Sequence, residues 1–340
     1  MKKNFLIKNK MCDLIKSFND KVEEIFSKKE LPKKLAVAVS GGCDSLALTL
    51  LLHEFCLAKK IKLFALTIDH KMRQASLIEA RELGKILAKK NISHKILTIS
   101  AKKIPQKNIE ANLRELRYEH LCGFCKKNKI EFLFLGHHLG DVAENFLIRL
   151  FRGSGLDGLS TIGEVVSGKW SVASEVILVR PLLDMNKDEL KDFLRAKKVK
   201  WFEDETNCDE KFLRNKIRKF FANFPEQNLI QKRIKKASDE IAKMRDFFDC
   251  IVEREAKKII HLQSDCSVLI AHKKLQKLDE KIALKILASI AMKLGQKPYK
   301  PRLEKLKKFY EYLMQNEIKP RNFYGCTVKK FDEKNLIIFK

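Results

Sequence analysis

Residues 35–57, LAVAVSGGCDSLALTLLLHEFCL, combine a β-prone apolar run, a turn with two glycines and a leucine-rich helical pattern. The run at 35–39 predicts a buried strand, and the pattern from Ser45 onward predicts a helix. Glycines in such a turn let backbone amides approach an anion closely, and the helix start adds N–H groups without partners. This strand, turn and helix are therefore predicted to bind phosphate.

Side chains of the turn extend the predicted phosphate site. Ser40 and Ser45 supply hydroxyl groups, and Asp44 is placed to hold Mg²⁺ beside the phosphates. The turn is not a Walker A loop, because that motif needs a Gly-Lys pair followed by Ser or Thr. No Gly-Lys pair in this chain has such a neighbour.

Strands and helices are expected to alternate along the next hundred residues. The predicted elements are a helix at 11–28, strands at 63–68, 94–99 and 132–136, and helices at 76–90, from 108 and from 141. Alternation of this kind predicts an α/β fold, a doubly wound parallel sheet with helices on both faces. Ligands bind such sheets at the carboxyl ends of the strands. Ser40, Asp69 and His137 all fall at those ends.

Seven motifs, in one order, resemble those of a known family. SGGCDS at 40–45 resembles the SGGxDS signature of the PP-loop, or N-type, ATP pyrophosphatases. The later motifs are similar to those of the tRNA(Ile)-lysidine synthases, a PP-loop family that modifies the wobble cytidine of an isoleucine tRNA. They are DHKMR at 69–73, EANLRELRY at 110–118, GHHLGDVAEN at 136–145, RGSGLDGL at 152–159, RPLL at 180–183, and DETN at 204–207 with RNKIR at 214–218.

The resemblance implies an ATP-dependent ligase that acts on RNA. Free L-lysine would be joined to C2 of the wobble cytidine in the CAU anticodon of tRNA(Ile), which changes codon specificity from AUG to AUA. The cytidine oxygen would be adenylated, pyrophosphate would leave, and the lysine amine would displace AMP. ATP and Mg²⁺ are the implied cofactors. No membrane partner is implied, and the oligomeric state, a homodimer included, is left open.

The resemblance also assigns roles to residues of the motifs. Catalytic roles fall on Asp44, His137, Asp141, Glu144 and Arg114. ATP is expected to bind at Ser40, Gly41, Gly42, Cys43, Asp44, Ser45, Asp69, His70 and Arg73, with Mg²⁺ on Asp44. Contacts with tRNA or the other substrate are expected from Arg117, Arg152, Asp204, Asn207, Arg214, Asn215 and Arg218.

The motif at 136–145 departs from the family pattern at three positions. Gly140 replaces an Asp, Val142 a Gln and Asn145 a Thr. Asp141 and Glu144 remain, three residues apart on one helical face, where they are expected to hold a lysine ammonium between them. The structural alternative is an acid pair that complements the helix dipole.

Two other functions are weighed against this interpretation. Cys122 and Cys125 form a C-x2-C pair, as in PP-loop enzymes that thiolate tRNA with an iron–sulfur cluster. No second pair at similar spacing accompanies them, and their i, i+3 positions in a helical pattern are typical of buried thiols. A basic RNA-binding module with a degenerate ATP site is disfavoured by the intact residues Ser40, Asp69 and His137.

Composition limits the class of protein. Lysine and arginine number 70 against 43 acidic residues, a net charge of +27, which favours a nucleic-acid partner unless a lysine-rich proteome explains it. Nine cysteines at irregular spacing indicate reduced thiols. With no apolar run of 18 residues and no expected signal peptide, a cytoplasmic protein is predicted.

Four regions are expected along the chain. They are an N-terminal helical extension at 1–34, a PP-loop catalytic domain at 35–222, a helical linker at 223–262 and a small tRNA-binding domain at 263–340. The last region is predicted to be mostly helical, with a β-hairpin formed by 323–328 and 336–339 around a charged turn.

Overall fold

The computed structural model describes residues 2–27, 30–69, 74–99, 109–160, 163, 165–166, 176–203, 213–263, 266–297 and 299–340. The chain divides into two compact units, Met1–Glu240 and Ile241–Lys340. The boundary falls inside helix α9 (Gln227–Ile259), within the segment expected to be a helical linker. Each unit has its own sheet and its own core.

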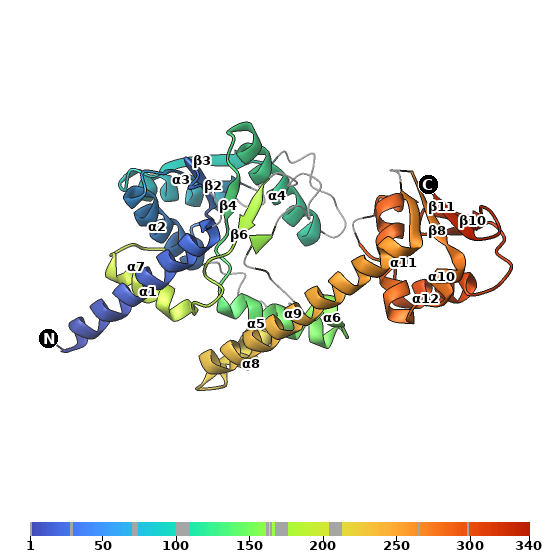
Figure 1. Cartoon of the computed structure of the whole chain (residues 1–340). Helices are drawn as coiled ribbons and strands as arrows, with labels where there is room; N and C mark the ends of the chain where they lie inside the picture. The colour runs from blue at the N-terminus through green and yellow to red at the C-terminus, as the bar shows by residue number, and fades with distance from the viewer. Residues whose placement is uncertain are drawn as a thin grey trace. The chain divides into compact units, whose positions relative to one another are not determined.

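A six-stranded sheet in the order β3-β2-β1-β4-β6-β5 forms the centre of the first unit (Figure 1). Its strands are β1 (Lys34–Ala38), β2 (Lys62–Asp69), β3 (Ser93–Thr98), β4 (Phe132–Phe134), β5 (Val165–Val166) and β6 (Ile177–Val179). All neighbours pair in parallel except the short edge strand β5. The predicted parallel sheet is confirmed. The direction of winding changes between β1 and β4, where such sheets bind ligands.

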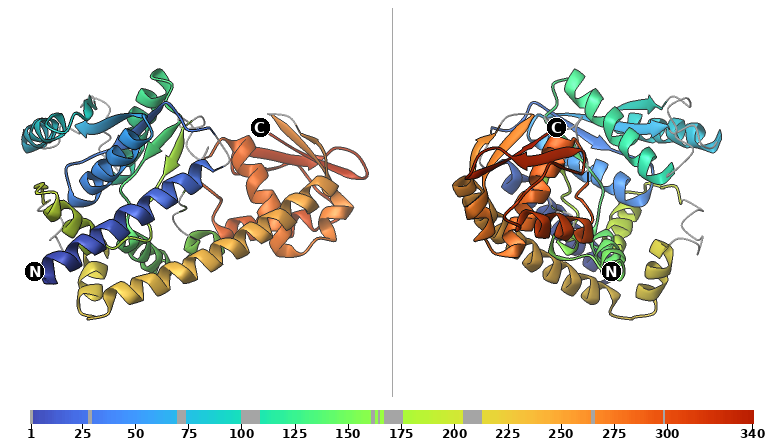
Figure 2. Two further views of the ribbon diagram at one scale, coloured as in Figure 1. Left: turned by 60° about the vertical axis from the view of Figure 1, so that its left-hand side comes forward. Right: turned by 90° about the vertical axis from the view of Figure 1, so that its right-hand side faces the viewer.

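Helices cover both faces of this sheet, because alternate residues of a strand point to opposite sides. Leu35 and Val37 of β1 join a core with α1 (Lys2–Phe26), α2 (Cys43–Ala58), α3 (Gln74–Ala88) and α7 (Lys187–Ala196). Ala36 and Ala38 pack on the other side, against α4 (Ile109–Lys127). Figure 1 shows α4 opposite α2 and α3, and Figure 2 shows α1 lying along α2.

A small helical layer brings distant parts of the sequence beside the end of β4. It contains α5 (Leu139–Phe151), α6 (Leu156–Leu159), α8 (Leu213–Ala222) and the start of α9. Ala143 of α5 packs against Ile217 and Phe221 of α8 in an apolar cluster of its own. This contact places the basic face of α8 against the first turn of α5.

The described residues of the second unit form a five-stranded antiparallel sheet, three helices of their own and the C-terminal part of α9. The strand order is β7-β8-β11-β10-β9, for β7 (Ile260–Gln263), β8 (Ser267–Ala271), β9 (Arg321–Phe323), β10 (Cys326–Lys330) and β11 (Asn335–Phe339), and the helices are α10 (His272–Gln276), α11 (Glu280–Gly295) and α12 (Leu303–Leu313). The predicted terminal hairpin is present as β10 and β11. Strands β7 and β8 were not expected. Across the described residues, no helix has the length and apolarity needed to cross a membrane.

Candidate active site at the strand ends

The loop between β1 and α2 has the backbone that an anion site needs. Gly41 adopts a φ of 89°, which glycine accommodates without strain. Gly42 is the N-cap of α2 and makes no side-chain capping bond, so the first amides of the helix keep their capacity to bind an anion. The Ser45 hydroxyl accepts a hydrogen bond from the Ser40 amide and lies 3.1 Å from the Ser40 hydroxyl. The serines thus brace the loop.

Two close contacts hold the loop in place. The Phe202 amide donates to the Gly41 carbonyl, and a Cβ on Gly41 would lie 2.6 Å from the Phe202 ring. At the end of β4, a Cβ on Gly136 would lie 2.9 Å from the Cα of Ser45. The start of α2 therefore rests directly on the backbone after β4. Cys43 is buried behind the loop, and burial, assisted by Asp44, raises the pKa of its thiol to about 12.

His138 connects the loop 40–45, which is the predicted phosphate loop, to the acid pair of Asp141 and Glu144. Its Nδ1 accepts a hydrogen bond from the Gly140 amide at 3.0 Å, so a neutral ring carries its proton on Nε2. Nε2 lies 3.7 Å from an oxygen of Asp44 and 3.7 Å from an oxygen of Asp141. The ring is buried at the N-terminus of α5. The carboxylates of Asp44 and Asp141 therefore both lie beside one imidazole.

The acid pair of α5 is already paired with arginines of α8. Arg214 contacts both carboxylates, by an ion pair to Asp141 and by Nε to Glu144 at 2.5 Å. Arg218 Nε donates to the other oxygen of Glu144 at 2.8 Å. Burial by itself would raise the pKa of Asp141, but His138 and Arg214 outweigh burial and lower it. Asp141 is therefore a carboxylate with little tendency to take up a proton.

Buried polar atoms without partners mark the same edge of the sheet. Within the described residues, three such side-chain atoms occur: Asp44 Oδ1, His137 Nδ1 and Arg180 Nε. They follow β1, β4 and β6, which are neighbours in the sheet. Burial lowers the pKa of His137 to about 3, so its ring is neutral at physiological pH. A buried polar group without a partner is costly, so the three atoms indicate where a ligand binds.

The structure brings most of the predicted site residues to this edge. The loop 40–45, His137, Asp141, Glu144, Arg214 and Arg218 meet there, and Asp69 is buried at the end of β2. Arg114 and Arg117 of α4 lie within electrostatic reach of His137. Arg152 lies within electrostatic reach of Arg149. Asn215 is buried on α8. The predicted residues His70, Arg73, Asp204 and Asn207 lie outside the described residues.

Sequence reasoning gave no role to three residues that the structure places here. Phe202 covers the phosphate loop, Arg149 binds the Gly158 carbonyl at 3.1 Å, and Arg180 directly follows β6. Arg180 stood in a recognised motif at 180–183. Its position at a strand end was hidden because β6 has only three residues and no clear pattern of its own.

Cys122 and Cys125 occupy the apolar core between α4 and the sheet. Burial raises the pKa of Cys122 to about 11 and that of Cys125 to about 12. Both side chains are therefore neutral thiols packed in this core. Among the described residues, no group of three or more histidines, cysteines or acids is arranged to hold a metal ion.

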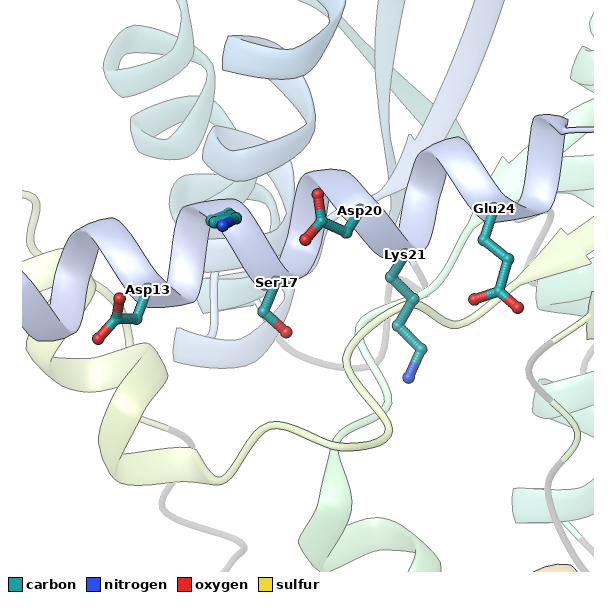
Figure 3. Close-up of a pocket in the computed structure, with 6 residues that line it drawn as sticks. Asp13, Ser17, Asp20, Lys21 and Glu24 are labelled. Carbon is teal, nitrogen blue, oxygen red and sulfur yellow. The ribbon is translucent and has the colours of Figure 1, made fainter.

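A hollow with charged side chains lies on the exposed side of α1 (Figure 3). All of its lining residues come from that one helix: Asp13, Lys16, Ser17, Asp20, Lys21 and Glu24. Lys21 is already paired with Asp184. The strand-end groups contribute nothing to this hollow, and it carries no functional assignment.

A strand-end phosphate loop on a parallel sheet of this topology defines a PP-loop protein, and residues 14–224 match the family described as the PP-loop domain. The tRNA(Ile)-lysidine synthase of Wolbachia pipientis wMel is 30% identical, covering 90% of this chain and 70% of the relative. That of Orientia tsutsugamushi (strain Boryong) is 31% identical, covering 93% of this chain and 72% of the relative. The chain belongs to the tRNA(Ile)-lysidine synthase family, as its motifs predicted.

A solved structure shares the fold of about two thirds of this chain. The U34-tRNA thiolase NcsA from Methanococcus maripaludis, described with its [4Fe-4S] cluster, superposes with a TM-score of 0.55. The match covers 67% of this chain and 80% of the thiolase, at 21% sequence identity. At that identity the likeness establishes a common fold, and it carries no conclusion about the reaction.

Proposed function

We propose that this chain joins free L-lysine to C2 of the wobble cytidine in the CAU anticodon of an isoleucine tRNA, with cleavage of ATP to AMP and pyrophosphate. Family membership supports this assignment. The structural observation that carries it is the loop 40–45 with an unpartnered oxygen of Asp44 at the switch between β1 and β4. Phosphate chemistry is expected at such a point.

ATP is assigned to the loop and Mg²⁺ to Asp44. The buried Oδ1 of Asp44 has no hydrogen-bond partner in the described structure, and a hard cation prefers a carboxylate oxygen. Most ligands of Mg²⁺ in such sites are water and phosphate oxygens, so a single protein carboxylate is enough to bind the ion. When bound, Mg²⁺ supplies positive charge to the triphosphate. The loop amides and Ser40 hold the phosphates in place.

Activation of the cytidine is the step that needs ATP. The C2 oxygen is a poor leaving group, so an amine does not displace it directly. Attack of that oxygen on the α-phosphorus forms a C–O–P linkage and breaks the bond to pyrophosphate. The lysine ε-amine then forms the C–N bond, and the oxygen departs with AMP. Arg114 and Arg117 stabilise charge on the transferring phosphoryl group.

His137 acts in this scheme as a neutral imidazole. Because burial lowers its pKa to about 3, it is not an acid at pH 7. A neutral ring accepts one hydrogen bond and donates one, and the buried Nδ1 has no partner among the described residues. Its role is to orient the C2 oxygen or the α-phosphate, and not to transfer a proton.

Lysine is assigned to Asp141 and Glu144. Their oxygens already accept from Arg214 and Arg218, so the ammonium shares the remaining lone pairs or displaces a guanidinium. The lowered pKa of Asp141 suits a group that binds an ammonium and keeps its own charge. The proton that lysine must lose before attack passes to Glu144 or to solvent.

The partners and location complete the proposal. Arg152, Arg214 and Arg218 contact the RNA, and residues 263–340 bind tRNA, consistent with a net charge of +27. Asp204, Asn207, His70 and Arg73 keep their predicted roles. The reaction takes place in the cytoplasm, where tRNA, lysine and ATP meet. A homodimer stays a prediction that sedimentation measurements test.

The decisive experiment supplies purified protein with ATP, Mg²⁺, labelled lysine and an isoleucine tRNA transcript with a CAU anticodon. A methionine tRNA with the same anticodon is the control. Label should enter the isoleucine tRNA alone and should be lost in Asp44→Ala. Release of pyrophosphate without incorporation of lysine would refute lysine as the nucleophile and leave the ATP site standing.

A further inference from the structure

Arg180 is a buried cation with neutral partners. Its side chain is 7% exposed and follows β6 directly. Nη1 donates to the Gly163 carbonyl at 2.9 Å, the Tyr118 hydroxyl is hydrogen-bonded to the guanidinium, and Nε has no partner. No carboxylate of the described residues pairs with it. Burying a charge without an opposite charge is expensive, so the site is built for an anion that the chain does not supply.

Other arginines surround this buried one. Arg114 lies above the ring of Tyr118, 5.9 Å from its centre, and it acts electrostatically on both Arg180 and Arg149. Arg117 and Arg180 both act on His137, and Arg152 acts on Arg149. We call Arg114, Arg117, Arg149, Arg152 and Arg180 the arginine cluster. Like charges held this close repel one another unless an anion is present.

The position of Arg180 favours RNA over ATP as the source of that anion. The triphosphate already has the loop after β1. Strands lie about 4.8 Å apart, so the end of β6 is roughly 10 Å from the end of β1, with His137 between them. Arg114 and Arg117 suffice for the α-phosphate, and the other three arginines match a series of phosphodiesters.

We propose that Arg180 binds a phosphodiester of the RNA substrate beside the base that reacts, as the buried end of the arginine cluster. Planar guanidinium groups bind phosphate through parallel hydrogen bonds, and the unpartnered Nε of Arg180 is available for one of them. Because His137 lies next to it, this contact sets the wobble base at the neutral imidazole. The inference rests on the proposed function and names the residue that positions its RNA.

The test measures binding without turnover. The full chain is titrated with a synthetic anticodon stem–loop of the isoleucine tRNA at several KCl concentrations, and separately with ATP. Arg180→Gln should weaken RNA binding roughly 10-fold to 100-fold and reduce the salt slope by about 0.7 to 0.9. ATP affinity should change less than about twofold, because ATP binding by itself does not use this contact.

Two further variants serve as controls. Arg81→Gln removes an exposed arginine from α3 and should leave both affinities unchanged. Arg180→Lys keeps the charge and loses the paired hydrogen bonds, so it should weaken RNA binding about threefold and keep the salt slope. If Arg180→Gln unfolds, as its thermal transition would show, Arg180→Lys decides the matter.

Each result has a distinct meaning. Weakened ATP binding with unchanged RNA binding would assign the phosphate to ATP and overturn the proposal. Unchanged binding of both ligands by Arg180→Gln would make Arg180 a structural residue. Failure of the unsubstituted protein to bind the stem–loop would instead count against the proposed function itself.

Discussion

Arg218 Nε donates a hydrogen bond to Glu144 Oε1 over 2.8 Å, joining α8 to the first turns of α5. Glu144 is 5% exposed, and its second oxygen accepts from Arg214. The two acids that are proposed to hold lysine are therefore neutralised by two guanidinium groups of the same chain. Lysine binding has to compete with, or add to, this arrangement.

Removal of Arg218 should tighten lysine binding. Arg218→Ala leaves Glu144 with one guanidinium, so the site becomes more attractive to an ammonium. A partly exposed pair contributes about 1 kcal/mol, which corresponds to roughly fivefold in lysine affinity. Equilibrium dialysis with labelled lysine and a non-hydrolysable ATP analogue measures this. Lys216→Ala, on the exposed side of α8, is the control. Unchanged affinity in Arg218→Ala would show that lysine binds elsewhere.

Alanine substitutions at the two glycines of the loop should have different effects on stability and ATP affinity. In Gly41→Ala, the positive φ and the Phe202 ring at 2.6 Å should lower the free energy of unfolding by about 1–3 kcal/mol. Gly42 has a φ of −70°, and an added Cβ lies 3.6 Å from its nearest neighbour, Ser40 Oγ. Gly42→Ala should therefore keep its stability and lose ATP affinity. Urea unfolding and ATP titration distinguish the two, and equal stability loss in both would contradict the geometry.

Stability should fall as the pH drops below about 6.5. Burial lowers the pKa of His137 to about 3 and also lowers that of His94. Unfolded histidine has a pKa near 6.5, so below that pH the unfolded chain binds protons that the folded chain does not. One such histidine contributes a loss of about 1.4 kcal/mol per pH unit, continuing until its folded pKa.

Unfolding in urea between pH 7.5 and 5 measures this dependence. His137→Asn should flatten the slope by about one proton, and the exposed His261→Asn should leave it unchanged. An equal slope in His137→Asn and in the unsubstituted protein would mean that His137 is protonated in the folded state.

The buried cysteine pair should be dispensable for catalysis. Cys122→Ala with Cys125→Ala removes both neutral thiols from the core under α4. Each substitution should cost about 1 kcal/mol of stability, and lysine incorporation should persist at a temperature where the protein stays folded. Cys12→Ala, at an exposed site, is the control. Loss of activity from the folded double variant would reopen thiolation chemistry.

Local patterns predicted the first four strands of the first unit well, because each is an apolar run of its own, and they missed β5 and β6. Apolar runs bounded by glycines or lysines predicted the ends of β1, β2 and β3 to within about one residue. In the second unit the prediction missed β7 and β8. The five residues of β8 become a strand by pairing with β11, where Leu336 lies opposite Ile270, and no pattern within 267–271 reports that partner.

By itself the sequence determined the phosphate loop, because two glycines, two serines and an aspartate between a strand and a helix suffice for that chemistry. It also determined that Ser40, Asp69 and His137 follow the carboxyl ends of strands. Tertiary structure alone decided that Arg214 pairs with Glu144, 70 residues away along the chain. It likewise left Arg180 buried without an acid. Such pairings depend on how α8 packs on α5 and how β6 joins β4, and both are contacts between distant segments.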